Sequence, residues 1–142
     1  MTNAKLSIAD YPLAEVRPEL VQGKRGQTLA DITLEGVLDG RVTLDDLKIT
    51  AAALHQQAEI ARDAGRATLA QNFERAADLV DVPQEVIMGL YEMLRPGRAG
   101  SKAELVEAAH DLEAKYGATA MAAFIREAAE VYDRRGLFKM RF

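Results

Sequence analysis

The stretch TAAALHQQAEIARDAGRATLAQNFERAADLVD, residues 50–81, carries the longest helical pattern in the chain. Apolar and small residues recur there every three or four positions, with polar residues between them. The expected inner stripe consists of Leu54, Ala58, Ala61, Gly65, Leu69, Phe73, Ala76 and Val80. The pattern therefore predicts amphipathic helix with one buried face.

Gly65 lies in the middle of this stretch and leaves two arrangements open. The chain either continues as one helix of about eight turns, or Gly65 adopts the left-handed region and Arg66 begins the return leg of a hairpin. An unbroken helix of that length would be unusual in a globular domain, and DAGR at 63–66 is typical of a helix stop. The sequence favours the hairpin.

Three further helices are expected after this stretch. Pro83 fits a first helical position, RPG at 95–97 is a stop, SKAE at 101–104 is a capping box, and Gly117 and Gly136 end the last two helices. The last helix should cover about 119–135. The expected inner residues are Val86, Ile87, Leu90, Tyr91 and Leu94, then Leu105, Ala108, Ala109 and Leu112, then Met121, Phe124, Ile125, Ala128, Ala129 and Tyr132.

Residues 28–50 suggest two short helical turns joined at Asp39 and Gly40. Thr33 is suited to cap the first turn, and Thr43 with Asp46 has the form of a capping box. The rival structure is a β-hairpin about Asp39 and Gly40. The capping threonines would have no role in a hairpin, so helical turns are favoured.

Residues 1–27 show no sustained period and predict an extended arm. Pro12 and Pro18 each restrict the backbone of the preceding residue to extended conformations. The apolar side chains of the arm pack either on its own domain or on another subunit. The expected fold is all-α, a compact helical subunit of about five to seven helices, with the arm at 1–27, a helical domain at 28–136 and a tail at 137–142.

Composition excludes several classes of protein. The chain has 142 residues, a net charge of −4 and no cysteine. It is therefore about one domain, without disulfides or cysteine-based sites, and its acidity argues against general nucleic-acid binding and against a helix-turn-helix DNA binder. No run approaches eighteen apolar residues, and the first ten residues lack the core of a signal peptide. We expect no membrane contact and a cytoplasmic location.

The search for chemistry finds no catalytic constellation. His55 and His110 fall on different expected helices without a partner at metal-ligand spacing, and no phosphate-binding loop occurs. Asp45 and Asp46 are explained by the dipole at the start of a helix. Arg95, beside a Pro-Gly loop, could hold an anion or a partner's carboxylate. We therefore predict no catalytic, cofactor-binding or metal-binding residue in this chain.

Seven motifs in the same order resemble the small (gamma) subunit of adenosylcobalamin-dependent diol and glycerol dehydratases, nearly from end to end. No single motif is diagnostic; their order makes chance improbable. They are DYPLA at 10–14, DITLE at 31–35 with VL at 37–38 and Gly40, QA at 57–58 with IA at 60–61, DAGR at 63–66, NFERAA at 72–77, LRP at 94–96 and AAFIREAA at 122–129.

The resemblance implies an enzyme whose chemistry lies in other chains. In that family, large, medium and small subunits form a dimer of heterotrimers, and a large TIM-barrel subunit holds the substrate. Adenosylcobalamin lies between the large and medium subunits, and a radical reaction converts 1,2-propanediol to propionaldehyde or glycerol to 3-hydroxypropionaldehyde. The small subunit is mainly helical and packs on the large one. No catalytic residue of the family maps onto this chain.

Two expectations follow from the ends of the sequence. Family members packed into bacterial microcompartments carry a longer N-terminal extension, whereas nine residues precede Asp10 here, which favours a soluble cytoplasmic enzyme. Apolar residues near both ends point to contacts with other subunits. The predicted interface residues are Tyr11, Pro12, Leu13, Arg95, Phe138 and Phe142. The alternative function is a stand-alone helical adaptor whose hairpins bind a peptide.

Overall fold

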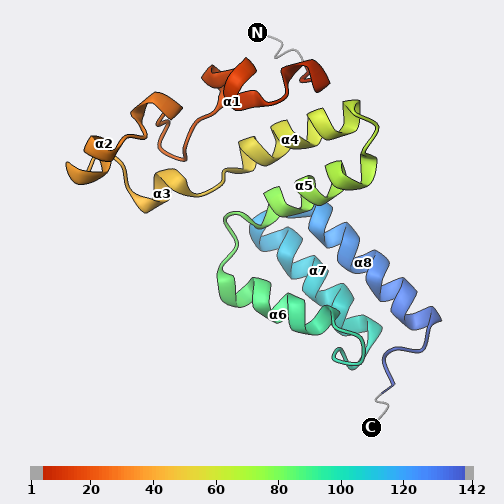
Figure 1. Ribbon diagram of the computed structural model, residues 1–142. Helices are drawn as coiled ribbons and strands as arrows, with labels where there is room; N and C mark the ends of the chain where they lie inside the picture. Colours follow the sequence, from red (N-terminus) through yellow and green to blue (C-terminus); the bar gives the residue numbers. More distant parts are fainter. Residues whose placement is uncertain (1–4, 140–142) are drawn as a thin grey trace. The chain divides into compact units, whose positions relative to one another are not determined.

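The computed structural model describes residues 5–139 and is built from helices (Figure 1). These residues contain no β-strand, only an isolated bridge between Gln22 and Thr28, so the all-α prediction is confirmed. The described chain divides into two compact units, of which the first ends at Ala77 and the second begins at Asp78. None of the helices within residues 5–139 has the length and apolarity to cross a membrane.

The hairpin predicted at Gly65 is confirmed. Helix α4, Ala51–Asp63, and helix α5, Ala67–Leu79, run in opposite directions on either side of a short turn (Figure 1). Gly65 has a φ of +75°, the left-handed conformation that a side chain disfavours. Small residues from both helices, Ala58, Ala61 and Ala70, are buried together with Phe73 against them.

The buried stripe of α5 differs from the expected one by one position. Ala70 and Ala77 are buried, whereas Leu69 and Ala76, which the sequence pattern placed inward, are exposed. The turn at Gly65 breaks the helical phase, so the inner face of α5 is not the continuation of the inner face of α4. The expectation of one stripe running through both helices is therefore wrong.

The structure adds short helical turns to the N-terminal arm. They are 3₁₀ helices at Ile8–Asp10 and Pro18–Leu20, with helix α1, Leu13–Val16, between them. Leu6 and Leu13 are buried against Ile60 of α4. Carboxylates of the same helix accept hydrogen bonds from backbone N–H groups of the arm: Glu59 from Leu6 at 2.9 Å and Asp63 from Ile8 at 2.8 Å. The arm thus packs on its own unit through these residues.

The segment between the arm and α4 forms the two expected helical turns, and the rival β-hairpin is excluded. A 3₁₀ turn at Leu29–Asp31 is followed by helix α2, Leu34–Leu38, and helix α3, Leu44–Leu47. The Thr33 hydroxyl accepts a hydrogen bond from the Gly36 N–H at 3.0 Å. Thr43 and Asp46 form the predicted capping box.

The second unit is a three-helix arrangement of α6, Gln84–Leu94, α7, Lys102–Tyr116, and α8, Thr119–Arg134. Helices α7 and α8 lie side by side (Figure 1). The largest fully buried side chains are Leu105, Leu112 and Ile125, all of them predicted inner residues. Tyr91 and Phe124 were also expected inside but are 59% and 37% exposed. The buried faces of α6 and α8 are therefore narrower than their apolar faces.

The ends of these helices differ from the sequence prediction in two details. Pro83 is the N-cap of α6 rather than its first helical residue. Glu104 accepts a hydrogen bond from the N–H of Gly100 at 2.9 Å, one residue before the expected Ser101. Helix α8 has no local side-chain cap, and Asp78 instead accepts the N–H of Met121 at 2.9 Å. The N-terminus of α8 is therefore satisfied from a distant part of the chain.

Two glycines of the second unit should respond to alanine in opposite ways. Gly117 ends α7 with a φ of +67°, so Gly117→Ala should lower the free energy of unfolding by about 1 kcal/mol. Gly89 lies inside α6, where an added Cβ meets nothing within 4 Å, so Gly89→Ala should raise it by up to about 1 kcal/mol. Denaturant titration measures both changes in the free energy of unfolding. If both substitutions change it in the same direction, the different roles given to the two glycines are wrong.

Candidate subunit interface

A group of large apolar side chains between positions 29 and 49 is exposed, and we call it the 29–49 apolar surface. Its members are between 44% and 78% exposed. They are Leu29, Leu34, Val37, Leu38, Leu44, Leu47 and Ile49. Scattered apolar residues are normal on a protein surface, but seven within 21 residues of one segment are typical of a protein–protein contact.

These side chains face outward because the interior of the segment is filled by other residues. Val42 is only 4% exposed, and its N–H donates to the carbonyl oxygen of Gly36 at 2.9 Å. A Cβ on Gly36 would lie 3.0 Å from both the Val42 side chain and the Asp31 carbonyl oxygen. The absence of a side chain at Gly36 therefore allows Val42 to occupy the interior, and the leucines of α2 stay outside.

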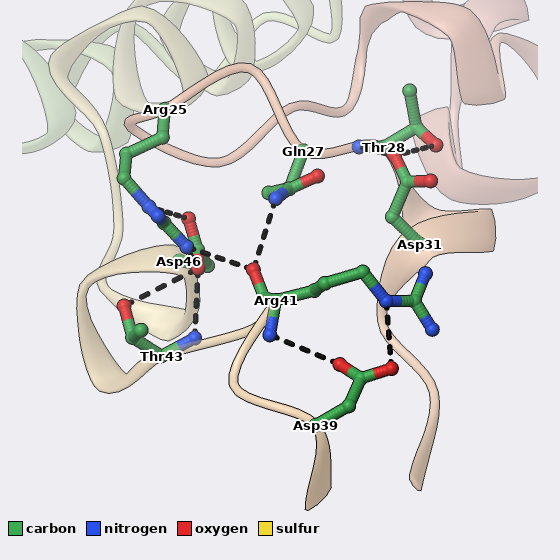
Figure 2. Close-up of polar contacts among 8 residues, drawn as sticks. All are labelled: Arg25, Gln27, Thr28, Asp31, Asp39, Arg41, Thr43 and Asp46. Atoms are coloured by element: carbon green, nitrogen blue, oxygen red, sulfur yellow. Dashed lines mark hydrogen bonds and ion pairs between the residues drawn. The ribbon is translucent and has the colours of Figure 1, made fainter. Parts of the chain in front are cut away.

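A buried carboxylate lies on α3 between two residues of this apolar surface. The side chain of Asp46 has no exposed area, whereas its α3 neighbours Leu44 and Leu47 are 78% and 59% exposed. Arg25 approaches Asp46 with two nitrogens; Nε donates to Oδ1 at 2.9 Å and Nη2 donates to Oδ2 (Figure 2). The Thr43 N–H donates to Oδ2 at 2.8 Å. Asp46 is therefore fully engaged within the chain.

The same guanidinium reaches the link between α2 and α3. Nη2 of Arg25 donates to the carbonyl oxygen of Arg41 at 2.9 Å, and Nε2 of Gln27 donates to that oxygen at 3.1 Å (Figure 2). Arg41 itself pairs with Asp39 at 2.8 Å. The loop before the 29–49 apolar surface is thus tied to the middle of the segment by side chains from two of its residues.

The contacts of Asp46 hold its pKa at about 2, below the ordinary value of 3.8. The hydrogen bond from Arg25 lowers the pKa most, the backbone N–H of Thr43 adds to it, and desolvation acts in the opposite direction. Because the pKa is lower in the folded chain, the stabilisation is complete above about pH 4 and is lost as the pH falls towards 2. Asp46 is therefore charged at neutral pH.

A groove of about 200 Å³ adjoins the same surface. The exposed Leu29, Leu47 and Ile49 contribute to its lining, together with Val21 and Ala53. Asp46 also borders the groove, but its side chain has no exposed area and its oxygens are engaged by Arg25 and Thr43. The groove thus shares Leu29, Leu47 and Ile49 with the 29–49 apolar surface.

The arm residues predicted at an interface lie in different environments. Tyr11 is 59% exposed and Pro12 is half-buried. Leu13 is 4% exposed and packs within its own unit against Ile60, so its side chain is already covered. Among the three, Tyr11 has the largest apolar area left to contact another protein.

The predicted interface residues of the second unit also differ among themselves. Arg95 is exposed and pairs with Glu92 at 3.2 Å, one turn earlier. Phe138 is half-buried and meets the ring of Tyr132 edge-on at 6.2 Å. The Tyr132 hydroxyl in turn donates to the carbonyl oxygen of Leu94. Phe138 is therefore taken up largely by its own unit, and Phe142 lies outside the described residues.

Sequence reasoning missed the 29–49 apolar surface. The signal was present, because two helical turns of five and four residues carry too many leucines for their short inner faces. The threonine caps predict the helical turns, but they do not show whether the leucine side chains face the interior or the solvent. The Arg25–Asp46 pair was missed as well, since it joins residues 21 positions apart.

The two histidines belong to different units. His55 is exposed on α4 of the first unit, and His110 is exposed on α7 of the second. The candidate site within residues 5–139 is therefore the 29–49 apolar surface, which is suited to packing against another protein.

A helical chain with such a surface is typical of a subunit in a larger assembly, and comparison with known proteins gives the family. The model of the dehydratase small subunit family matches residues 6–139, and the chain belongs to this family. It is 51% identical over 132 residues to the propanediol dehydratase small subunit of Citrobacter freundii, covering 93% of this chain and 76% of that protein. It is 49% identical over 138 residues to that of Salmonella typhimurium, covering 97% and 79%.

Proposed function

We propose that this chain is the non-catalytic small subunit of an adenosylcobalamin-dependent dehydratase that converts 1,2-propanediol to an aldehyde. The names of the relatives support propanediol as the substrate. The similarity to two propanediol dehydratase small subunits carries the proposal, and the 29–49 apolar surface agrees with it, because a subunit must offer apolar area to its partner. The resemblance to diol and glycerol dehydratases leaves glycerol as a related substrate.

The proposed partners are a large and a medium dehydratase subunit, assembled as a dimer of heterotrimers in the cytoplasm. The large subunit would cover the 29–49 apolar surface and Tyr11. Radical reactions need a site that excludes water and side reactions, and a rigid helical subunit supports such a site from outside. The interior of the second unit, with Leu105 and Ile125 fully buried, supplies that rigidity.

Two grooves within residues 5–139 are small for a cobalamin. One, lined by α6 and α7 residues such as Gly89 and Met93, measures about 220 Å³, and the groove beside Asp46 measures about 200 Å³. Pockets that bury even a drug-sized ligand usually measure between about 300 and 1,000 Å³. Following the resemblance to diol and glycerol dehydratases, we assign the cofactor to the large and medium subunits, and no step of the reaction to residues of this chain.

Co-expression with the large and medium subunits of a homologous dehydratase tests the proposal. The chain should co-purify with both, and the complex should convert 1,2-propanediol when adenosylcobalamin is added. The purified chain alone should be prone to aggregation at high concentration, and it should neither bind corrinoid nor convert the diol. A monodisperse, well-folded chain that binds neither subunit would favour the peptide-binding adaptor. Conversion of the diol by the chain alone would overturn the non-catalytic role.

A further inference from the structure

We infer that Arg25 and Asp46 are positioning residues for assembly, holding the 29–49 apolar surface in the shape that the large subunit binds. This inference rests on the proposed function and adds the residues on which the contact surface depends. Asp46 is inaccessible, so its effect on binding must pass through the segment that it holds. Neither residue belongs to the group of exposed apolar side chains itself.

The position of Asp46 within the segment is the first argument. It lies on α3 between Leu44 and Leu47, two members of the apolar surface, and its side chain points inward while theirs are exposed. Movement of Asp46 would therefore turn both leucines. Through Arg25, the same carboxylate is linked to the Arg41 carbonyl, which lies between α2 and α3.

The second argument is that little else fixes the segment. Helices of four and five residues are not stable by themselves. Val42 is the only large apolar side chain buried among residues 28–49. Two further ion pairs of the segment, Asp39 with Arg41 and Asp45 with Lys48, are exposed, and exposed pairs contribute little. The conformation thus depends on the contacts that Asp46 makes.

The backbone at Gly23 gives a third and independent argument. A Cβ at this position would lie 2.9 Å from the backbone oxygen of Asp46. The loop that carries Arg25 therefore packs directly on α3, with no room for a side chain between them. An alanine at position 23 would push loop and helix apart without removing either charge.

Competition during co-expression measures the effect on assembly. Tagged wild-type chain and an untagged variant are expressed together with the large and medium subunits, and mass spectrometry gives their ratio in the purified complex. Asp46→Asn and Arg25→Gln should bind at least about tenfold more weakly, the result expected when the competent conformation falls to about a tenth of the molecules. The matched control Asp45→Asn removes the adjacent, exposed carboxylate and should compete within about twofold of wild type.

Hydrogen exchange on the full-length chain separates positioning from general unfolding. In Asp46→Asn, protection should fall in residues 28–49 and stay unchanged in α7 and α8. Gly23→Ala should also weaken binding, although the charges of Arg25 and Asp46 are both present. If Asp46→Asn fails to fold, the result for Gly23→Ala tests the inference in its place.

The inference would be overturned if Asp46→Asn or Gly23→Ala entered the complex as well as the wild-type chain does, or if Asp45→Asn lost as much binding as Asp46→Asn. Either result would leave the proposed function standing. If the wild-type chain does not co-purify with the large and medium subunits, the proposed function itself is overturned.

Discussion

Replacing Leu34 and Leu44 together with alanine should weaken binding to the large and medium subunits by about a thousandfold. Both side chains are at least 75% exposed in this chain, so neither contributes much to its own stability. Burying each against a partner contributes about 2 kcal/mol more for leucine than for alanine, or about 4 kcal/mol for the pair. Alanine is at least as favourable as leucine in a helix, so α2 and α3 should persist.

The matched control for this double variant is Leu69→Ala. Leu69 is 37% exposed on α5 of the same unit and does not belong to the 29–49 apolar surface. Its replacement should leave the affinity within about threefold of wild type. Competition in the co-expressed complex measures both variants. Wild-type incorporation of the Leu34 and Leu44 double variant would show that this surface is not where the partner binds.

The second large effect is expected in the interior of the second unit. Leu105 has no exposed area and packs among Leu112, Ile125 and several alanines of α7 and α8. Leu105→Ala should lower the free energy of unfolding by about 2–5 kcal/mol, because the small neighbouring side chains cannot move in to fill the cavity. A domain is stable by only about 5–15 kcal/mol, so this loss is large.

Val106→Ala is the control for this variant. Val106 follows Leu105 on α7 but is 40% exposed, so its replacement should cost less than about 1 kcal/mol. Hydrogen exchange of α7 and α8 together with denaturant titration distinguishes the two. Comparable destabilisation by both variants would contradict the assignment of Leu105 to the core.

The sequence predicted most of the helices because their signals are local. Gly65, Gly117 and the RPG stop at 95–97 act through backbone conformations that depend on the residue itself and its neighbours. Thr33 and Ser101 cap helices through N–H groups three residues away. Such signals require no knowledge of the rest of the fold, so the helix boundaries could be predicted to within a residue or two.

The phase of α5 and the cap of α8 could not be predicted in the same way. Ala70 rather than Leu69 is buried because α4 fixes which side of α5 faces inward, and an alanine allows the closer approach. Asp78 caps α8 across 43 positions of sequence. Both depend on where a distant element lies, which the periodicity of one helix does not contain.

The sequence by itself determined the helical fold, the hairpin at Gly65, the short turns capped by Thr33 and Thr43, and the resemblance to dehydratase small subunits. Only the tertiary structure decided that Asp46 is buried on Arg25 while Leu34, Leu38 and Leu44 face outward. The physical reason is that an apolar side chain has the same appearance in a sequence whether its own chain or another protein covers it. Its direction is fixed by what already fills the interior, here Val42 and a paired carboxylate.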